Sequence, residues 1–234
     1  MKSSNYKISI IIPVLNEEQF ISKILKYLTT HSSPEYIEEI LVIDGGSTDK
    51  TVQIALENGA KVIHSDKGRA KQLNTGAMSA KGAILYFLHV DTFPPIKFDS
   101  LIVNQVKQGN KVGCFLLKFD TNSRFLNFFG WLTRINLSIC RGGDQSLFIT
   151  KKLFDTTSGF NENYIIYEDN EFIRRIYKIS NFTILPFHVK TSTRRYDDKG
   201  KITLQYHFGV IHLKNYLGAG PEKLYDYYRR KVAV

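Results

Sequence analysis

The sequence predicts an α/β protein: a single domain with a mixed, mostly parallel sheet flanked by helices. Short β-branched runs alternate with helix-like stretches through the first 120 residues. The runs are almost continuously apolar, as in strands that are covered on both faces. With 234 residues, 43% of them hydrophobic, the chain can bury one large core.

The elements follow from these two periodicities. The first helix carries Ile21, Ile24, Leu25 and Leu28 at helical spacing. The second is expected to begin at the capping sequence 47–49 and to stop at 58–59, and the third to cover 68–81. Beyond residue 120 the pattern is irregular, and the aromatic stretch 125–140 is expected to be a packed helix, too polar to span a bilayer. The predicted strands are 8–14, 39–45, 61–65, 83–90 and 112–119.

The composition limits the partners. The net charge of +10 suggests an anionic partner, either nucleic acid, nucleotide phosphates or an anionic membrane surface. Cys114 and Cys140 have no CxxC spacing, which argues against a metal–thiolate site and fits a reducing compartment. The first 18 residues contain an apolar run of at most eight residues and no cleavage pattern of a signal peptide. We therefore expect a cytoplasmic protein.

Polar residues follow three of the predicted strands. They are Asn16 and Glu17, then Asp44, then His89 and Asp91. Ligands of parallel sheets bind at the carboxyl ends of the strands, so this placement favours a binding site. His89 and Asp91 would project from the same side of the strand 83–90, either as a metal or phosphate site or merely as a capped strand end.

The segment IDGGSTDKT (43–51) places an acid, two glycines and a helix start in succession, which suits a nucleotide. It is neither a GxGxxG fingerprint nor a P-loop, so dinucleotide and NTPase sites are disfavoured. In PVLNEE (13–18), Asn16 could simply cap the following helix.

Four segments taken together resemble glycosyltransferase family 2. They are IIPVLNEE, VIDGGSTDKT, KGRAKQLNTGA and LHVDT, followed by a block that runs from GGDQ to YEDNEF. The resemblance implies a GT-A fold over residues 1–234, with about 8–95 as the nucleotide-binding half and about 96–234 as the acceptor and catalytic half. It also implies a nucleotide-diphosphate sugar donor, most often UDP, a divalent metal (Mn²⁺ or Mg²⁺) and inversion at the anomeric carbon.

The resemblance also implies roles for particular residues. Asp44 would accept a hydrogen bond from the imide of the base. Asp91 matches the last acid of the family's DxD metal motif, and His89 replaces the first, as in an HxDT subset. Imidazole nitrogen and carboxylate oxygen both suit Mn²⁺, whereas Mg²⁺ prefers oxygen. The positions matched to the nucleotide and donor side are Pro13, Asn16, Glu17, Asp44, Gly45, Lys67, Arg69 and Asn74.

The later motifs supply the catalytic and charged groups. Glu168 and Asp169 could simply favour a helix N-terminus, but the family's ED motif implies Asp169 as the general base, with Glu168 in support. Arg194 and Arg195 are either a solvated basic loop or a diphosphate clamp. Asp144 and Gln145 are expected to line the sugar or acceptor pocket. His188, His207 and His212 are expected in the core or on the surface rather than as ligands.

Three other functions compete with sugar transfer. A sugar nucleotidyltransferase needs a basic, Gly-rich loop after the first strand, which PVLNEE does not offer. A non-catalytic nucleotide-sugar binder is disfavoured by the retained acids Glu168 and Asp169. Nucleic-acid binding lacks a recognisable module. The hydroxyl acceptor stays open between a glycan, a lipid carrier and a small molecule, and the basic tail YDYYRRK allows peripheral membrane contact.

Overall fold

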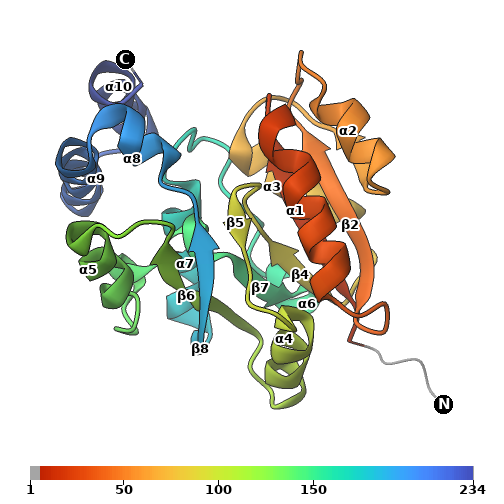
Figure 1. The fold of residues 1–234 in the computed structure, drawn as a ribbon. Coiled ribbons are helices and arrows are strands. Elements are labelled where there is room, and N and C mark those ends of the chain that lie inside the picture. Colours follow the sequence, from red (N-terminus) through yellow and green to blue (C-terminus); the bar gives the residue numbers. More distant parts are fainter. Residues whose placement is uncertain (1–5, 234) are drawn as a thin grey trace.

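The computed structural model describes residues 6–233, which form one mixed sheet with helices on both faces (Figure 1). The strand order is β3-β2-β1-β4-β7-β6-β8-β5. The strands are β1 Ile8–Val14, β2 Ile37–Asp44, β3 Lys61–His64, β4 Ile84–Phe87, β5 Thr92–Phe93, β6 Val112–Phe119, β7 Leu147–Thr150 and β8 Thr183–Thr191. The helices are α1 Glu18–His31, α2 Thr51–Glu57, α3 Arg69–Ser79, α4 Phe98–Lys107, α5 Arg124–Leu132, α6 Lys151–Asp155, α7 Glu168–Ile179, α8 Arg194–Lys199, α9 Lys201–Tyr216 and α10 Pro221–Lys231, with two short 3-10 turns, η1 Ser138–Cys140 and η2 Gly143–Gln145.

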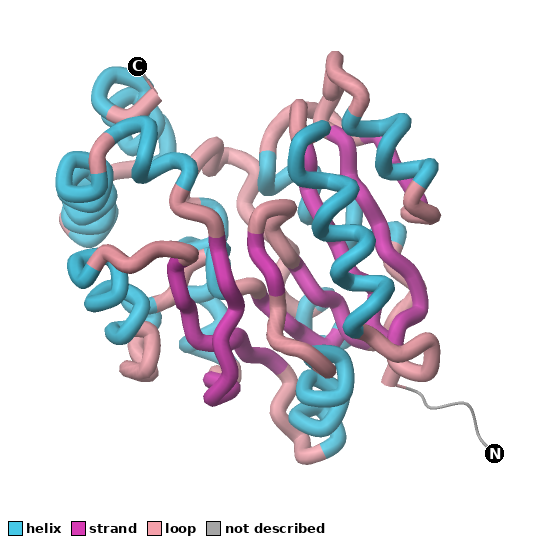
Figure 2. Tube along the Cα trace, in the orientation of Figure 1, coloured by secondary structure: helices cyan, strands magenta, loops and turns pink. Residues whose placement is uncertain are grey.

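The predicted fold class is confirmed. Strands β3, β2, β1 and β4 are parallel neighbours, whereas β7 pairs antiparallel with both β4 and β6. Because β7 lies between β4 and β6, the two halves of the chain share one sheet (Figure 2). Their polar strand ends therefore lie close together.

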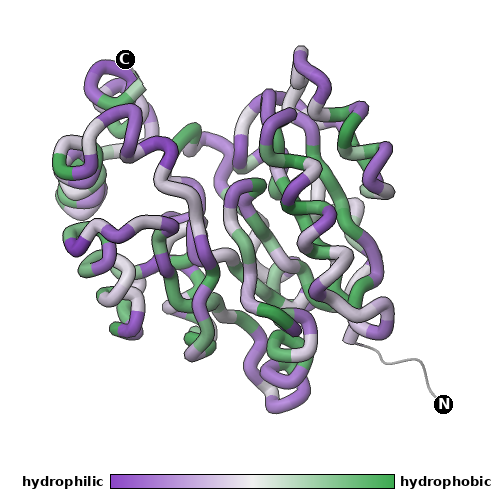
Figure 3. The backbone as a smooth tube through the Cα atoms, viewed as in Figure 1, coloured by the Kyte–Doolittle hydropathy of each residue, from purple (hydrophilic) through white to green (hydrophobic). Residues whose placement is uncertain are grey.

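Two apolar layers hold the helices on the sheet. On one face, alternate residues of β1 pack with α1, α2 and α4, as the buried Ile10, Ile24 and Phe98 illustrate. On the other face, Ile11 packs in a second cluster with α3, α6 and α7. Figure 3 shows the hydrophobic colouring concentrated along the strands. Burial on both faces is the reason why the strands are continuously apolar.

A third, smaller cluster lies at the end of β6. It joins α5, α8 and α9 to the end of the chain through five buried side chains. These helices gather at one end of the molecule, on the far side from α1 and α2 (Figure 1). The five side chains are Phe119, Leu126, Tyr196, Leu204 and Val232.

The strands 8–14 and 112–119 are confirmed residue for residue. The other predicted boundaries are off by one or two residues, and three elements differ more. β4 ends at Phe87, so 88–91 form a turn rather than the end of the strand 83–90, and the amide of Thr92 donates to the carbonyl of His89. α2 begins at Thr51 instead of 47–49, because 45–50 form a loop. The stretch 125–140 is helical only to Leu132.

Candidate active site

Most of the predicted site residues lie beyond the carboxyl ends of β1, β2 and β4 and at the N-terminus of α7. They form two groups. The first, called the catalytic cluster after its predicted role, consists of Arg69, His89, Asp144, Glu168 and Asp169. A charged bridge consists of Glu17, Asp91 and Arg194.

His89 is the centre of the catalytic cluster. Its Nδ1 lies 3.1 Å from Asp144 Oδ1, and its Nε2 lies 3.7 Å from Asp169 Oδ2. Burial and Arg69 lower the pKa of His89, but the two carboxylates outweigh them and raise the pKa to about 9. In this arrangement His89 is an imidazolium that holds two carboxylates together, a partnership that the sequence did not predict.

Gly143 leaves the space in which this pair meets. A Cβ at this position would collide with Asp169 Oδ2 and would lie 2.8 Å from His89 Nε2. The glycine therefore permits the 141–145 segment to approach the carboxylate of Asp169 closely. Gly143 was not predicted as a site residue, although the GG pair before Asp144 was a signal for such an approach.

Glu168 and Asp169 differ in their surroundings. Glu168 is 3% exposed, and its Oε1 lies 3.5 Å from Arg69 Nη1. Burial, with the charge of Asp169, raises the pKa of Glu168 to about 7. The side chain of Asp169 is 15% exposed, so it is the more accessible acid. Tyr167 precedes them in a left-handed conformation with φ of 71°, which turns the chain into α7.

The charged bridge joins three elements. The guanidinium of Arg194 donates two hydrogen bonds to Glu17, of 2.7 and 2.8 Å, and its Nε lies 3.0 Å from Asp91 Oδ2. It also stacks 4.4 Å above the ring of Phe20. The guanidinium that was predicted to clamp a diphosphate thus binds the carboxylates of Glu17 and Asp91 instead. Glu17, which was predicted on the nucleotide side, is bound to Arg194.

The residues for a divalent metal are few. Across residues 6–233, no three His, Cys, Asp or Glu side chains converge as a metal site. Asp91 and His89 have suitable chemistry, a carboxylate oxygen and an imidazole nitrogen, but the first is paired with Arg194 and the second with Asp144. Of the two, only the Asp91 carboxylate could bind a metal ion as it stands, because His89 would first have to lose its proton.

The loop after β2 is organised by Asp44, which is almost fully buried. Its carboxylate accepts from the amides of Gly46 and Ser47 and from His64. Burial raises its pKa, but these hydrogen bonds outweigh it and lower the pKa overall. Asp44 therefore remains ionised while it shapes the loop, and its predicted contact with a base stays a prediction.

The loops after β1 and β2 are tied to each other. Asn16, with φ of 55°, accepts from the amide of Thr48, and the amide of Glu17 donates to Thr51. The residue before α1 is Glu17, so the alternative of Asn16 as its N-cap is wrong. The two loops form one edge because each bonds the other as well as its own helix.

Gln72 is a supporting residue that the sequence analysis missed. Its amide donates to the carbonyls of Val14 and Ile43, at the ends of β1 and β2, and it packs against Gly45. Pro13 is half-buried in β1, opposite Ile43. Gln72 stands two residues before Asn74 in KQLN. Nothing in that string shows that Gln72 supports the strand ends whereas Asn74 was matched to the nucleotide.

The remaining predicted residues are dispersed. The amide of Asn74 bonds the backbone of Phe160 and the carboxylate of Glu162, so in this structure it anchors the 160 loop. Lys67 is exposed on the loop before α3. Arg195 donates to the hydroxyl of Tyr228, and its charge helps to lower the pKa of Asp144. Gln145 is buried, and its Nε2 has no hydrogen-bond partner among residues 6–233.

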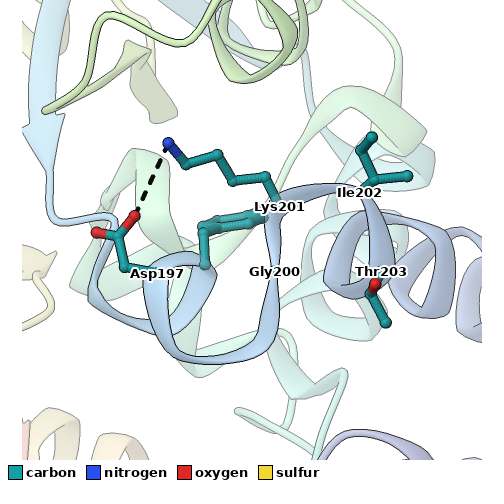
Figure 4. A pocket seen from close by; sticks show the side chains of 6 residues that line it. Asp197, Gly200, Lys201, Ile202 and Thr203 are labelled. Atoms are coloured by element: carbon teal, nitrogen blue, oxygen red, sulfur yellow. Dashed lines mark ion pairs between the residues drawn. The ribbon is translucent and has the colours of Figure 1, made fainter.

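A separate pocket lies at the junction of α8 and α9 (Figure 4). It is lined by Tyr196 and by residues of the turn around Gly200, and the ion pair of Asp197 with Lys201 spans 3.8 Å beside it. None of the predicted site residues lines this pocket, so it is distinct from the catalytic cluster.

The sequence profile described as "Glycosyl transferase family 2" matches residues 9–161, which hold β1 to β4 and the segment with Gly143 and Asp144. The chain belongs to glycosyl transferase family 2. Within this family, it is 37% identical over 94 residues to glycosyltransferase AglE of Haloferax volcanii, a match that covers 37% of this chain and 31% of AglE. The chain spans about a third of the length of the first curated relatives that it matches.

Solved structures support the GT-A fold of this family 2 chain. TarS of S. aureus superposes with a TM-score of 0.66 at 20% identity, over 85% of this chain and 38% of TarS. Glucosyl-3-phosphoglycerate synthase of Mycobacterium tuberculosis, in a complex with Mn²⁺, UDP-glucose and phosphoglyceric acid, superposes with a TM-score of 0.61 at 19% identity, over 78% of this chain and 70% of the synthase.

Proposed function

We propose that this chain is an inverting glycosyltransferase that moves a sugar from a nucleotide-diphosphate donor, UDP-linked by family usage, to a hydroxyl acceptor. The observation that carries the proposal is the position of Asp169: an accessible carboxylate at the N-terminus of α7, held by His89 beside Asp144. The acceptor stays open between a glycan, a lipid carrier and a small molecule.

The proposed division of labour follows the sheet. Residues 8–95 would bind the nucleotide through the edge formed by the loops after β1 and β2, where Asp44 stays ionised. Residues 96–234 would supply the acceptor pocket, with Asp144 and Gln145 beside the base. The unpartnered Nε2 of Gln145 supports this, because a buried donor without a partner is costly and a substrate oxygen would satisfy it.

Asp169 would act as the general base and take the proton of the acceptor hydroxyl as the glycosidic bond forms. Its exposure supports this role, since a base must reach its substrate. Glu168 is less suited, because it is buried against Arg69. We assign Glu168 to the support of Asp169 and Arg69.

Charge on the leaving diphosphate would be neutralised by a divalent ion and by arginines. Asp91 would hold the ion, and His89 would join it only after losing the proton that Asp144 and Asp169 stabilise. The Mn²⁺ and UDP-glucose in the related synthase support this choice. Arg194 is bound to Glu17 and Asp91, so it would have to exchange a carboxylate for the diphosphate.

The first experiment is a thermal-shift panel of nucleoside diphosphates with and without Mn²⁺, because a ligand that binds only the folded state raises the melting temperature. UDP is expected to give the largest shift, and the shift should grow with Mn²⁺. The absence of any shift with every nucleotide would contradict the proposal.

The second experiment tests the base. Asp169→Asn should retain the UDP shift and lose about 10² to 10⁴ in the rate of sugar transfer or donor hydrolysis, because an amide cannot accept the proton. Asp155→Asn, at the end of α6, is the matched control and should behave like the native chain. Normal turnover by a folded Asp169→Asn variant would refute the assignment.

Two other functions give different outcomes in the same assays. A sugar nucleotidyltransferase would release pyrophosphate, and a nucleotide-sugar binder would show the thermal shift with no turnover. We also propose a cytoplasmic location, which the free thiols of Cys114 and Cys140 support. Within residues 6–233, no helix has both the length and the apolarity needed to cross a membrane.

A further inference from the structure

The helix α5 and the turn after it expose an unusual number of apolar side chains. Trp131 is 53% and Phe128 is 55% exposed, and their rings stack with centroids 6.4 Å apart. Exposed apolar residues are normal when they are single, but a contiguous set indicates an interaction surface. The exposed set in this segment is Phe125, Phe128, Trp131, Ile135, Leu137 and Ile139.

The outer face of α9 repeats the pattern. Its inner face buries Leu204 and Ile211, so the helix is packed against the protein on one side only. Successive spacings of four, three, four and three residues place a second set of exposed residues along one stripe. These are Ile202, Tyr206, Gly209, Leu213 and Tyr216, followed by Leu217.

Positive charge is concentrated in the same elements. Residues 121–143 contain three arginines and no acid, and residues 199–234 contain seven basic and two acidic residues. These two segments together carry ten basic against two acidic residues, a net charge of +8 out of the +10 of the chain. The remaining three quarters of the sequence are almost neutral. All ten basic side chains except the buried Arg141 are at least partly exposed, so this charge would favour an anionic partner.

We propose that the end of the molecule formed by α5, η1, α9 and α10, here called the apolar–basic end, binds an anionic membrane surface. Aromatic and aliphatic side chains among Lys and Arg are the composition of helices that lie in the headgroup region. Trp and Tyr favour that region because their rings are apolar and their polar atoms stay hydrated. The basic residues would contact anionic headgroups.

Four hydrogen bonds connect this end to residues that flank the catalytic cluster. On the inner side of α9, His212 bonds the hydroxyl of Tyr167, which directly precedes Glu168, and Asn215 accepts from Arg174 of α7. Beyond the end of α5, the buried Arg141 donates to the carbonyls of Thr133 and Ile135. Arg141 directly precedes the glycine pair 142–143. Membrane contact through this end would therefore hold the acceptor half of the molecule at the lipid surface.

Trp131 makes the inference testable without a label, because it is the only tryptophan of the chain. We add vesicles of phosphatidylcholine with phosphatidylglycerol to the full chain and record the Trp131 emission. A shift to shorter wavelength is expected, together with quenching by brominated lipids. Vesicles of phosphatidylcholine alone should give a smaller shift, and high salt should reverse the binding because headgroup attraction is screened.

Variants separate the apolar from the basic contribution in a vesicle co-sedimentation assay. Leu213→Ser with Tyr216→Ser should lower binding by about tenfold or more, because two apolar side chains are lost from the interface. Arg229→Gln with Arg230→Gln should lower it by a similar factor, at about fivefold per charge. Leu56→Ser is the control: Leu56 is also exposed, but on α2 at the opposite end (Figure 1).

Several results would overturn the inference. One is an unchanged Trp131 emission spectrum with anionic vesicles at low salt. Another is a loss of vesicle binding in Leu56→Ser as large as that in the variant with Leu213→Ser and Tyr216→Ser. Self-association that depends on Leu213 and shields Trp131 without vesicles would show that a second copy of the chain covers this face instead. The variants should still turn over the sugar donor in solution, without vesicles. A loss of membrane binding is then distinguishable from a failure of the proposed sugar transfer.

Discussion

Gly143→Ala offers a sharp test of the site, because it adds one methyl group at the centre of the catalytic cluster. The new Cβ would overlap Asp169 Oδ2 and lie 2.8 Å from His89 Nε2. Real Cβ contacts are not that close, so Asp169 must move by about 1 Å. A misplacement of about 1 Å in a catalytic group can cost about 10²-fold in rate.

The matched control is the neighbouring residue. Gly142 has an extended backbone, with φ of −165°, and a Cβ there would meet no atom within 4 Å. Gly142→Ala should therefore keep the native rate, whereas Gly143→Ala should transfer sugar about 10²-fold more slowly with unchanged affinity for UDP. Steady-state rates and calorimetric titration with UDP measure the two quantities. If both variants turn over like the native chain, Asp169 is not the base or does not lie where the structure has it.

Three further perturbations test the remaining groups. Asp44→Ala should weaken nucleotide binding by roughly 1.5–3 kcal/mol, the value of a hydrogen bond to a charged acceptor, and unchanged affinity in calorimetry would remove Asp44 from the nucleotide site. Asp91→Ala should abolish the part of the thermal shift with UDP that depends on Mn²⁺, and a shift that survives would assign the ion to other ligands. Folding raises the pKa of Glu168 to about 7, so the folded state binds its proton more tightly than the unfolded state. The free energy of unfolding should therefore fall as the pH rises from about 4.5 through 7. In urea unfolding, Glu168→Gln should lack this fall with pH, and the same fall in both proteins would contradict the pKa shift.

The strands show what could be read from the sequence. β1 and β6 were predicted residue for residue, because a fully buried strand must be apolar on both faces and the string ISIIIPV states this directly. The order of four motifs along the chain likewise identified the family, since each motif is local. The boundary of β4 was wrong for a local reason too: Leu88 and Val90 are buried in a turn, and burial alone does not distinguish a turn from a strand.

Sequence alone therefore determined the fold class and the inventory of acids and arginines, because both depend on residue types at short spacing. Tertiary structure decided the partnerships. Arg194 meets Glu17 across 177 positions of sequence, and His89 meets Asp144 across 55. Such pairs form only when β7 enters the sheet between β4 and β6 and brings the two halves together, and no local pattern encodes that strand order. The same dependence explains why Gly143 was missed, because a glycine's importance lies in the atoms that approach it from elsewhere in the chain.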